Sequence, residues 1–230
     1  MKNLRLAMLT LLVLVSGSQA FALDILLATG SNPDLEVRDR LTEFGHTVLL
    51  SDPATWDSSF DYNQFDVVAL QFGSADPADI GHLVAAVDAG VVGVVMFRSY
   101  GHVNTSVALG LENGSATGDW QSGSVEIVNT DHPITSYNMA GPIDLGFTYK
   151  AEYFPGPDTT VLAAGSEGPT LVVHNTRMVI GVPFYGHPGG YSSETEEAKE
   201  LTRSALLWAA GYGSVATENT SLSSVKEMFR

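Results

Sequence analysis

Short apolar runs alternate with amphipathic segments through the first half of the chain, and this pattern predicts an α/β fold. The runs at residues 23–28, 46–50, 66–70 and 93–97 are apolar on both faces and rich in β-branched residues. Segments with helical apolar spacing follow the first, third and fourth runs. Strands without a polar face need helices on both sides, and strand–helix alternation favours parallel pairing. We therefore predict a flavodoxin-like, doubly wound, mostly parallel sheet.

The second half of the chain has a different hydrophobic pattern, with several short apolar runs and no helical segment between them. The predicted strands are residues 124–128, 149–154, 160–163, 171–174 and 178–182, and residues 112–124 are expected to form a surface loop. Closely spaced strands of this kind predict antiparallel additions to the sheet. A Gly/Pro-rich loop at residues 183–193 leads to the last predicted helix, residues 194–210, which Gly211 ends.

The first 22 residues have the three parts of a secretory signal peptide. Lys2 and Arg5 make a positive start, residues 6–15 are almost entirely apolar, and Ala20-Phe21-Ala22 matches the small-residue cleavage pattern. We expect cleavage near Ala22 and export to the periplasm or the extracellular space. Residues 23–211 then form one α/β domain, and residues 212–230 form a polar tail. No later apolar stretch is long enough for a transmembrane helix, so no integral membrane segment is expected after cleavage.

Charge and cysteine content narrow the possible functions. Residues 1–22 hold two of the 11 Lys and Arg residues and none of the 26 acidic residues, so the rest of the chain carries a formal charge of −17 (9 − 26). Such a surface repels nucleic acid and anionic membranes. The chain has no cysteine, which excludes disulfides, thiolate metal sites and a cysteine nucleophile within it. The oligomeric state is left open.

Several polar or small residues follow the predicted parallel strands directly. Gly30, Gly73 and Ser99 each come after an apolar run. In doubly wound sheets ligands bind at the carboxyl ends of the strands, so these residues are expected at one edge. The corner Arg98-Ser99-Tyr100-Gly101-His102 lies between a strand and a segment with helical spacing (Val103, Val107, Leu111), which is the arrangement of a nucleophile elbow.

The order of these motifs resembles the class I glutamine amidotransferase-like superfamily, especially its secreted branch near the trehalose-utilisation (ThuA-like) group. The resemblance covers most of residues 23–211 and rests on five motifs: residues 45–48 (GHTV), 66–70 with Gly73, 98–102 (RSYGH), 131–135 (DHPIT) and 178–184 (MVIGVPF). It implies that Gly73 is the oxyanion glycine and that Ser99 occupies the position of the enzymes' nucleophilic cysteine.

The chain departs from the catalytic pattern of that superfamily. The cysteine is absent, and His187-Pro188 lies two residues later than an ungapped match would place it, so that Tyr185 falls there instead. Gly189 replaces the acid that follows. A glutaminase needs a thiolate, a base and an orienting acid in one hydrogen-bonded line. We therefore do not expect glutamine hydrolysis, and any enzyme activity would be that of another hydrolase.

Two interpretations of the Ser99 corner stay open. A serine hydrolase would use Ser99 as nucleophile and His187 as base, with Glu194 or Glu196 behind the imidazole and the N–H groups of Gly73 and Tyr100 as oxyanion donors. The simpler interpretation, which we prefer, is that Ser99 is a helix N-cap. Arg98 could bind a carboxylate or a sugar hydroxyl, or pair with an acidic side chain.

The preferred hypothesis is an exported, catalytically degenerate amidotransferase-like domain that binds a small polar ligand, with carbohydrate as the favoured class, or a protein partner. Flat aromatic rings suit sugars, and the expected ligand-binding residues are Gly30, Arg98, His102, Tyr185 and Tyr191. No cofactor is expected, and the histidines lack the spacing of a metal site. His46 is expected at the surface, and His132 is expected to cap a turn. A structural or assembly module attached through its tail is a further alternative.

Overall fold

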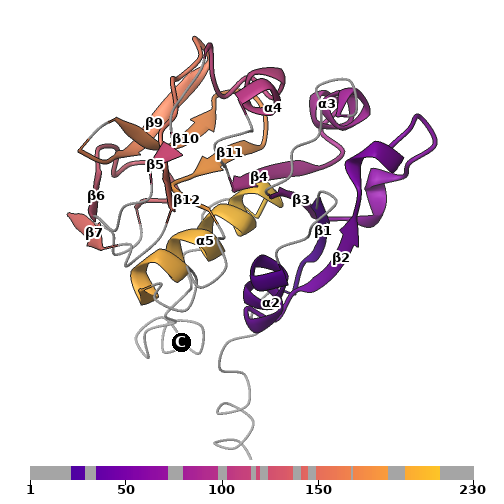
Figure 1. The fold of residues 1–230 in the computed structure, drawn as a ribbon, viewed down its shortest axis with the longest axis horizontal. Coiled ribbons are helices and arrows are strands. Elements are labelled where there is room, and N and C mark those ends of the chain that lie inside the picture. The colour runs from indigo at the N-terminus through magenta and orange to yellow at the C-terminus, as the bar shows by residue number, and fades with distance from the viewer. Residues whose placement is uncertain are drawn as a thin grey trace, which may run out of the picture.

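The computed structural model describes residues 22–28, 35–71, 80–97, 103–114, 118–119, 124–136, 141–144, 149–166, 168–185 and 195–212. In these ranges a large sheet of nine strands carries helices on both faces, beside a small sheet of three strands (Figure 1). Within the same ranges no helix is both long enough and apolar enough to cross a membrane.

The parallel part of the large sheet has the strand order β2-β1-β3-β4-β11. Its members are β1 (Asp24–Ala28), β2 (Thr47–Ser51), β3 (Val67–Leu70), β4 (Gly93–Phe97) and β11 (Val179–Val182). Each of these pairs is parallel. This is the 2-1-3-4-5 order of flavodoxin-like sheets, so the predicted fold class is confirmed. The elements between the strands are α2 (Leu35–Glu43), η1 (Pro53–Thr55), η2 (Tyr62–Gln64), α3 (Gly81–Asp88) and α4 (Val103–Ala108).

Antiparallel strands extend the sheet on the side of β11, as the close spacing of the later strands predicts. The order continues through β10 (Pro169–His174), β9 (Thr159–Ala164), β6 (Ser124–Ile127) and β7 (Pro142–Asp144). β11 joins the two parts, because it pairs antiparallel with β10 and parallel with β4. The small sheet consists of β5 (Gly118–Asp119), β8 (Tyr149–Ala151) and β12 (Phe184–Tyr185). β5 lies within the stretch expected to be a loop.

Two apolar cores, one on each face, hold the helices to the sheet. Helices α2 and α5 (Glu196–Ala209) bury Leu41 and Leu201 against one face, together with alternate strand residues such as Phe97. Helix α3 buries Leu83 against the other face, with Met96 from the same strand. Adjacent residues of β4 therefore serve opposite cores, which explains why the strand is apolar at every position.

Local sequence signals account for the ends of two helices. Gly45, with φ of 90°, follows α2 in the left-handed conformation that glycine adopts without strain. At the start of α5 the hydroxyl of Thr195 accepts a hydrogen bond from Ala198 N at 3.2 Å, which is an N-cap. Glu196 and Glu197 fill the first turn, where negative charge favours the helix dipole.

Helix α4 differs from its predicted apolar face. Val107 is 44% exposed, while Thr105 and Ser106 are buried. The Ser106 hydroxyl lies 3.3 Å from Met96 Sδ, so it reaches a soft acceptor inside the core. A helix of six residues has little more than one turn, and its packing is set by the strand beneath it rather than by its own apolar spacing.

Candidate functional site

The parallel strands end together at one edge of the large sheet, which we call the carboxyl edge. Ala28 at the end of β1 pairs with Leu70 at the end of β3, and Leu70 pairs with Met96. Phe97, the last residue of β4, pairs with Val182, the last residue of β11. The ends of β1, β3, β4 and β11 thus lie at the same edge, and this edge is where doubly wound sheets bind ligands.

Most of the site residues expected from the sequence lie outside the described ranges. They are Gly30, Gly73, Arg98, Ser99, Tyr100, His102, His187 and Tyr191. Their positions in the sequence tie three of them closely to the carboxyl edge: Gly30 comes two residues after β1, Gly73 three residues after β3, and Arg98 directly after β4. The geometry of a Ser99–His187 pair stays a prediction.

Tyr185 is the one expected ligand-binding residue whose backbone is described. It ends β12, the strand that follows β11, and its Cα pairs with that of Tyr149 in β8. The small sheet therefore begins beside the end of β11, separated from it by Pro183 alone. This places the backbone of Tyr185 near the carboxyl edge.

Tyr153, one of the aromatic residues of the second half, has a structural role at this edge. Its ring is 1% exposed. Its hydroxyl donates toward the carbonyl oxygens of Val182, at 3.1 Å, and Met96, at 3.3 Å. A Cβ at Gly181 would lie 2.5 Å from the Tyr153 ring, so the glycine makes room for it. Tyr153 thus ties the ends of β4 and β11 together. Its neighbour Phe154 is 48% exposed.

Gln71 is the residue that the sequence analysis missed. It directly follows β3, and its backbone N–H donates to Ala28 O at 3.4 Å. The residue is 3% exposed, and neither Oε1 nor Nε2 of its side chain has a hydrogen-bond partner. Buried polar groups almost always find partners, and an orphaned one costs about 1–3 kcal/mol. The available signal was a glutamine next to four apolar strand residues and two positions before Gly73.

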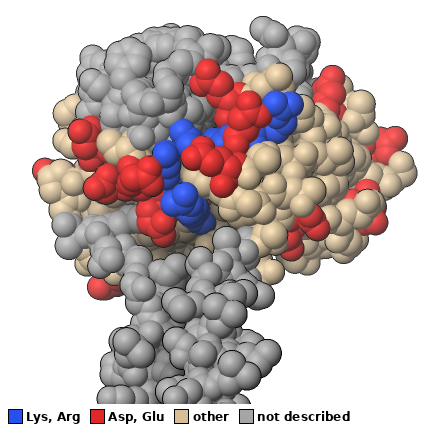
Figure 2. All heavy atoms as spheres, turned by 90° about the horizontal axis from the view of Figure 1, so that it is seen from below, with Lys and Arg blue, Asp and Glu red and all other residues tan. Residues whose placement is uncertain are grey.

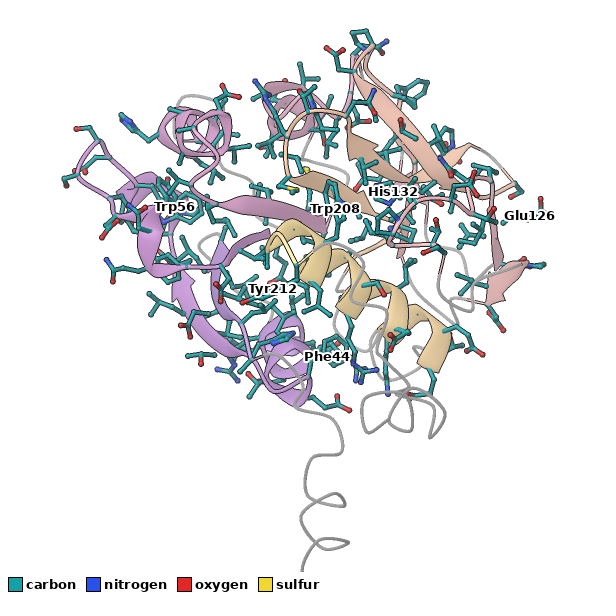
Figure 3. All side chains as sticks on the ribbon, turned by 180° about the vertical axis from the view of Figure 1, so that it is seen from behind. Phe44, Trp56, Glu126, His132, Trp208 and Tyr212 are labelled. Carbon is teal, nitrogen blue, oxygen red and sulfur yellow. The ribbon has the colours of Figure 1, made fainter. Side chains whose placement is uncertain are left out.

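Other buried polar side chains show how such groups are ordinarily satisfied. Glu112 is 4% exposed, and its carboxylate accepts a hydrogen bond from Phe154 N at 3.0 Å. The buried hydroxyl of Tyr62, like the side-chain amide of Gln71, has no hydrogen-bond partner. Burial raises the pKa of Tyr62 to about 12. Tyr62 belongs to an aromatic group after β2 that includes Trp56, labelled in Figure 3, at a ring-centroid distance of 6.0 Å.

His132 and His174 each accept a hydrogen bond from a backbone N–H group. His132 Nδ1 accepts from Ile134 N at 3.3 Å, which confirms the turn cap expected there, and the ring lies 5.4 Å from that of Trp208 (Figure 3). Burial lowers the pKa of His132. His174 Nδ1 accepts from Thr176 N at 3.2 Å. In the part of the chain that the structure describes, no three His, Asp or Glu residues gather as a metal site would require.

His46 corrects an expectation. It is 8% exposed rather than at the surface, and its Nδ1 accepts a hydrogen bond from Leu23 N at 3.2 Å. The ring packs edge-on to Phe44 at a centroid distance of 6.3 Å. The polar type and the strand-start position favoured exposure, but the imidazole fills the space where β1 and β2 begin.

The face of the molecule that carries α2 and α5 has side chains of both charges (Figure 2). Figure 2 shows basic side chains in the middle of one face with acidic side chains around them. On α2 and α5, which lie there, each basic side chain pairs with an acid of its own helix; the pairs are Arg38–Asp39, Arg40–Glu43, Lys199–Glu196 and Arg203–Glu200. Glu196, considered as an orienting acid, is exposed, and the Lys199 ammonium that donates to it lowers its pKa.

Comparison with known proteins identifies the fold. No family model and no curated protein matches the sequence. Among solved structures, a ThuA-like protein from Bacteroides uniformis is 13% identical, with a TM-score of 0.64 over 84% of this chain and 94% of that one. A glutamine amidotransferase from Thermotoga maritima is 14% identical, with a TM-score of 0.56 over 81% and 97%.

A third similar structure is the α-L-fucosidase isoenzyme 2 from Paenibacillus thiaminolyticus. It is 15% identical, with a TM-score of 0.52, and the match covers 82% of this chain but 33% of the fucosidase. At these identities the likeness concerns the fold. Together with the strand order, it shows that this chain has the class I glutamine amidotransferase-like fold that ThuA-like proteins share.

Proposed function

We propose that the protein is an exported, catalytically degenerate amidotransferase-like domain that binds a small polar ligand, with neutral carbohydrate as the favoured class, at the carboxyl edge of its sheet. The observation that carries the proposal is Gln71, a buried side-chain amide without a hydrogen-bond partner next to the end of β3. A ligand that bonds this amide recovers the free energy that its isolation costs.

The chemistry of the amide favours a sugar. Oε1 accepts hydrogen bonds and Nε2 donates two, so a ligand must offer donors and acceptors side by side. Adjacent sugar hydroxyls do both. Tyr185, and beyond the described residues Tyr191, would supply aromatic faces near the same edge. The fucosidase with this fold in one third of its length acts on a carbohydrate, which agrees with this ligand class. Burial of Gln71 also suits a small ligand better than a flat protein surface.

Catalytic degeneracy is proposed from the sequence. The chain has an amidotransferase-like fold and no cysteine, so the thiolate that attacks glutamine in that superfamily has no counterpart here. The proposal predicts that neither glutamine nor its analogues are hydrolysed.

A ligand screen tests the binding proposal. Melting temperatures of the purified protein would be measured with neutral mono- and disaccharides and, for contrast, with free amino acids and sugar acids. We expect a neutral sugar to raise the melting temperature of the wild type and of Gln64→Leu, a matched change at an exposed glutamine, but not of Gln71→Leu. No stabilisation by any sugar, or an equal shift in Gln71→Leu, would contradict the proposal.

The serine hydrolase is the alternative that a second experiment separates. A fluorophosphonate probe reacts with an activated serine nucleophile. We expect no labelling of the folded wild type beyond that of Ser99→Ala. Labelling that Ser99→Ala and His187→Ala both abolish would replace the degenerate domain with a Ser99-dependent hydrolase.

A further inference from the structure

The chain passes from solvent into the core at a single peptide bond. Ala22 is exposed, and Leu23 is 0% exposed. Leu23 N donates to His46 Nδ1 at 3.2 Å, and Leu23 O accepts from Thr47 N at 2.9 Å. Both backbone groups of Leu23 are therefore held at the edge where β1 and β2 begin.

The same bond is the cleavage point that the signal-peptide pattern predicts. Ala20-Phe21-Ala22 places the cut after Ala22. The cleavage point was assigned from residue types alone, whereas the change from exposed Ala22 to buried Leu23 is a property of the folded domain. The two observations are therefore independent. Cleavage there would convert the amide nitrogen of Leu23 into an α-ammonium group, which has three protons and a positive charge.

His46 can accept a bond from that ammonium. Nδ1 accepts only when it carries no proton, and Nε2 is buried without a partner. The groups around the ring are Phe44 and, on α5, Arg203, which lies 4.3 Å from the Phe44 ring centroid. Burial and the Arg203 charge lower the pKa of His46, and the Asp66 carboxylate opposes them. The neutral, accepting form therefore prevails at pH 7.

Asp66 places a negative charge beside the same strand. Its Oδ2 accepts from Asp24 N, the amide next to Leu23, at 2.8 Å. An ammonium at Leu23 would thus have an imidazole acceptor and a nearby carboxylate, whereas the uncleaved chain has only a neutral amide there.

We propose that cleavage after Ala22 creates a bound N-terminus, in which the α-ammonium of Leu23 donates a charge-assisted hydrogen bond to Nδ1 of His46. Because of this bond, the domain that begins at Leu23 is more stable than a chain extended by even one residue. Hydrogen bonds from charged donors are stronger than those from neutral ones. The expected gain in the folding equilibrium constant is about fivefold.

A thermodynamic cycle of processing and His46 tests this site. Chains that begin at Leu23 and at Ala22 would be prepared by cleavage of a fusion, each with His46 and with His46→Phe, and unfolded in urea at pH 7. The chain that begins at Leu23 should be about fivefold more stable with His46, and the two chains should be equal with His46→Phe. No gain with His46, or the same gain in both backgrounds, overturns the proposal.

A second variant and a second measurement keep the test decisive if His46→Phe does not fold. His46→Asn retains a hydrogen-bond acceptor, so the chain that begins at Leu23 should still be more stable than the chain that begins at Ala22. If this gain in stability were lost in His46→Asn, the result would count against the bound ammonium. N-terminal sequencing of the exported protein should give Leu23-Asp24-Ile25, and any other first residue refutes the assigned processing site. Neither result depends on ligand binding at the carboxyl edge.

Discussion

The two edges of the parallel sheet use their polar groups differently. At the edge where the strands begin, Asp66 binds Asp24 N, His46 binds Leu23 N, and Met178 O accepts from Val94 N at 2.7 Å. At the carboxyl edge Tyr153 also ties strands together, but the side-chain amide of Gln71 has no hydrogen-bond partner. At the first edge His46 uses Nδ1 to close the fold and only its Nε2 lacks a partner, whereas at the carboxyl edge neither polar atom of the Gln71 side chain is used. This difference is why we assign the ligand to the carboxyl edge.

The largest effect is expected from crowding the edge where the strands begin. A Cβ at Gly93 would lie 1.9 Å from Ala209 O, which is backbone at the end of α5 and cannot rotate away. Gly93→Ala should lower the free energy of unfolding by about 3 kcal/mol. Urea unfolding followed by circular dichroism measures it. Gly81→Ala, where nothing lies within 4 Å of the added Cβ, is the control and should cost nothing. Equal stability of the two variants would refute the close packing of α5 on β4.

Tyr153→Phe tests the tie between the ends of β4 and β11. The variant keeps the ring and loses the hydroxyl that donates to Val182 O and Met96 O, so the unfolding free energy should fall by about 1 kcal/mol. Phe154→Tyr adds a hydroxyl at an exposed neighbour and should change little. If Tyr153→Phe had the same unfolding free energy as the wild type, the hydroxyl would not be needed to hold the ends of β4 and β11 together.

Acid should weaken the fold before the carboxylates titrate. Burial is the main cause that lowers the pKa of His46, His132 and His174. The unfolded chain therefore binds protons at a higher pH than the folded one. Stability contributed by these rings is complete above about pH 6.5 and declines as the pH falls toward their lowered pKa values. As the pH is lowered from 7.5 to 5, the urea midpoint of the wild type should fall. The midpoint should fall less steeply in His46→Asn and as steeply as in the wild type in His82→Asn, a control at an exposed histidine. A flat profile in the wild type would contradict the burial of these rings.

A smaller effect is expected for the partly exposed ion pair between the end of α3 and the turn that joins β10 to β11. Arg177 Nε lies 2.6 Å from Asp88 Oδ1, and its guanidinium also donates to Leu109 O at 3.3 Å. Solvent screens such pairs, so Arg177→Gln should cost about 0.5 kcal/mol, and added salt should shrink the difference. A salt-independent loss would assign the role of Arg177 to its bond with Leu109.

The sequence predicted the parallel half well, because its signals are local. The run at residues 93–97 is β4 without an error at either end, and Gly45 marks the end of α2. The antiparallel extension was also predicted. The fifth place of β11 in the parallel order was not, because pairing between residues 94–97 and 179–182 depends on contacts far apart in the chain.

The site was less accessible to sequence reasoning. The carboxyl edge could be located from strand ends, but Gln71 was passed over because a glutamine after a strand usually faces solvent. His46 was misplaced for the same reason. In both cases the polar type suggested exposure, whereas the residue is buried in the folded domain. The Ser99 corner and His187 lie outside the described residues, so their chemistry stays a prediction.

The most direct test of the account is the stability of Gln71→Leu without ligand. An ordinary buried amide that is hydrogen-bonded costs stability when it is removed, whereas an orphaned amide replaced by an apolar side chain of similar size does not. We predict that Gln71→Leu unfolds at an equal or higher urea concentration than the wild type, with exposed Gln64→Leu unchanged. A loss of about 1 kcal/mol or more in Gln71→Leu alone would show that the fold already uses this amide, and the ligand site at the carboxyl edge would lose its support.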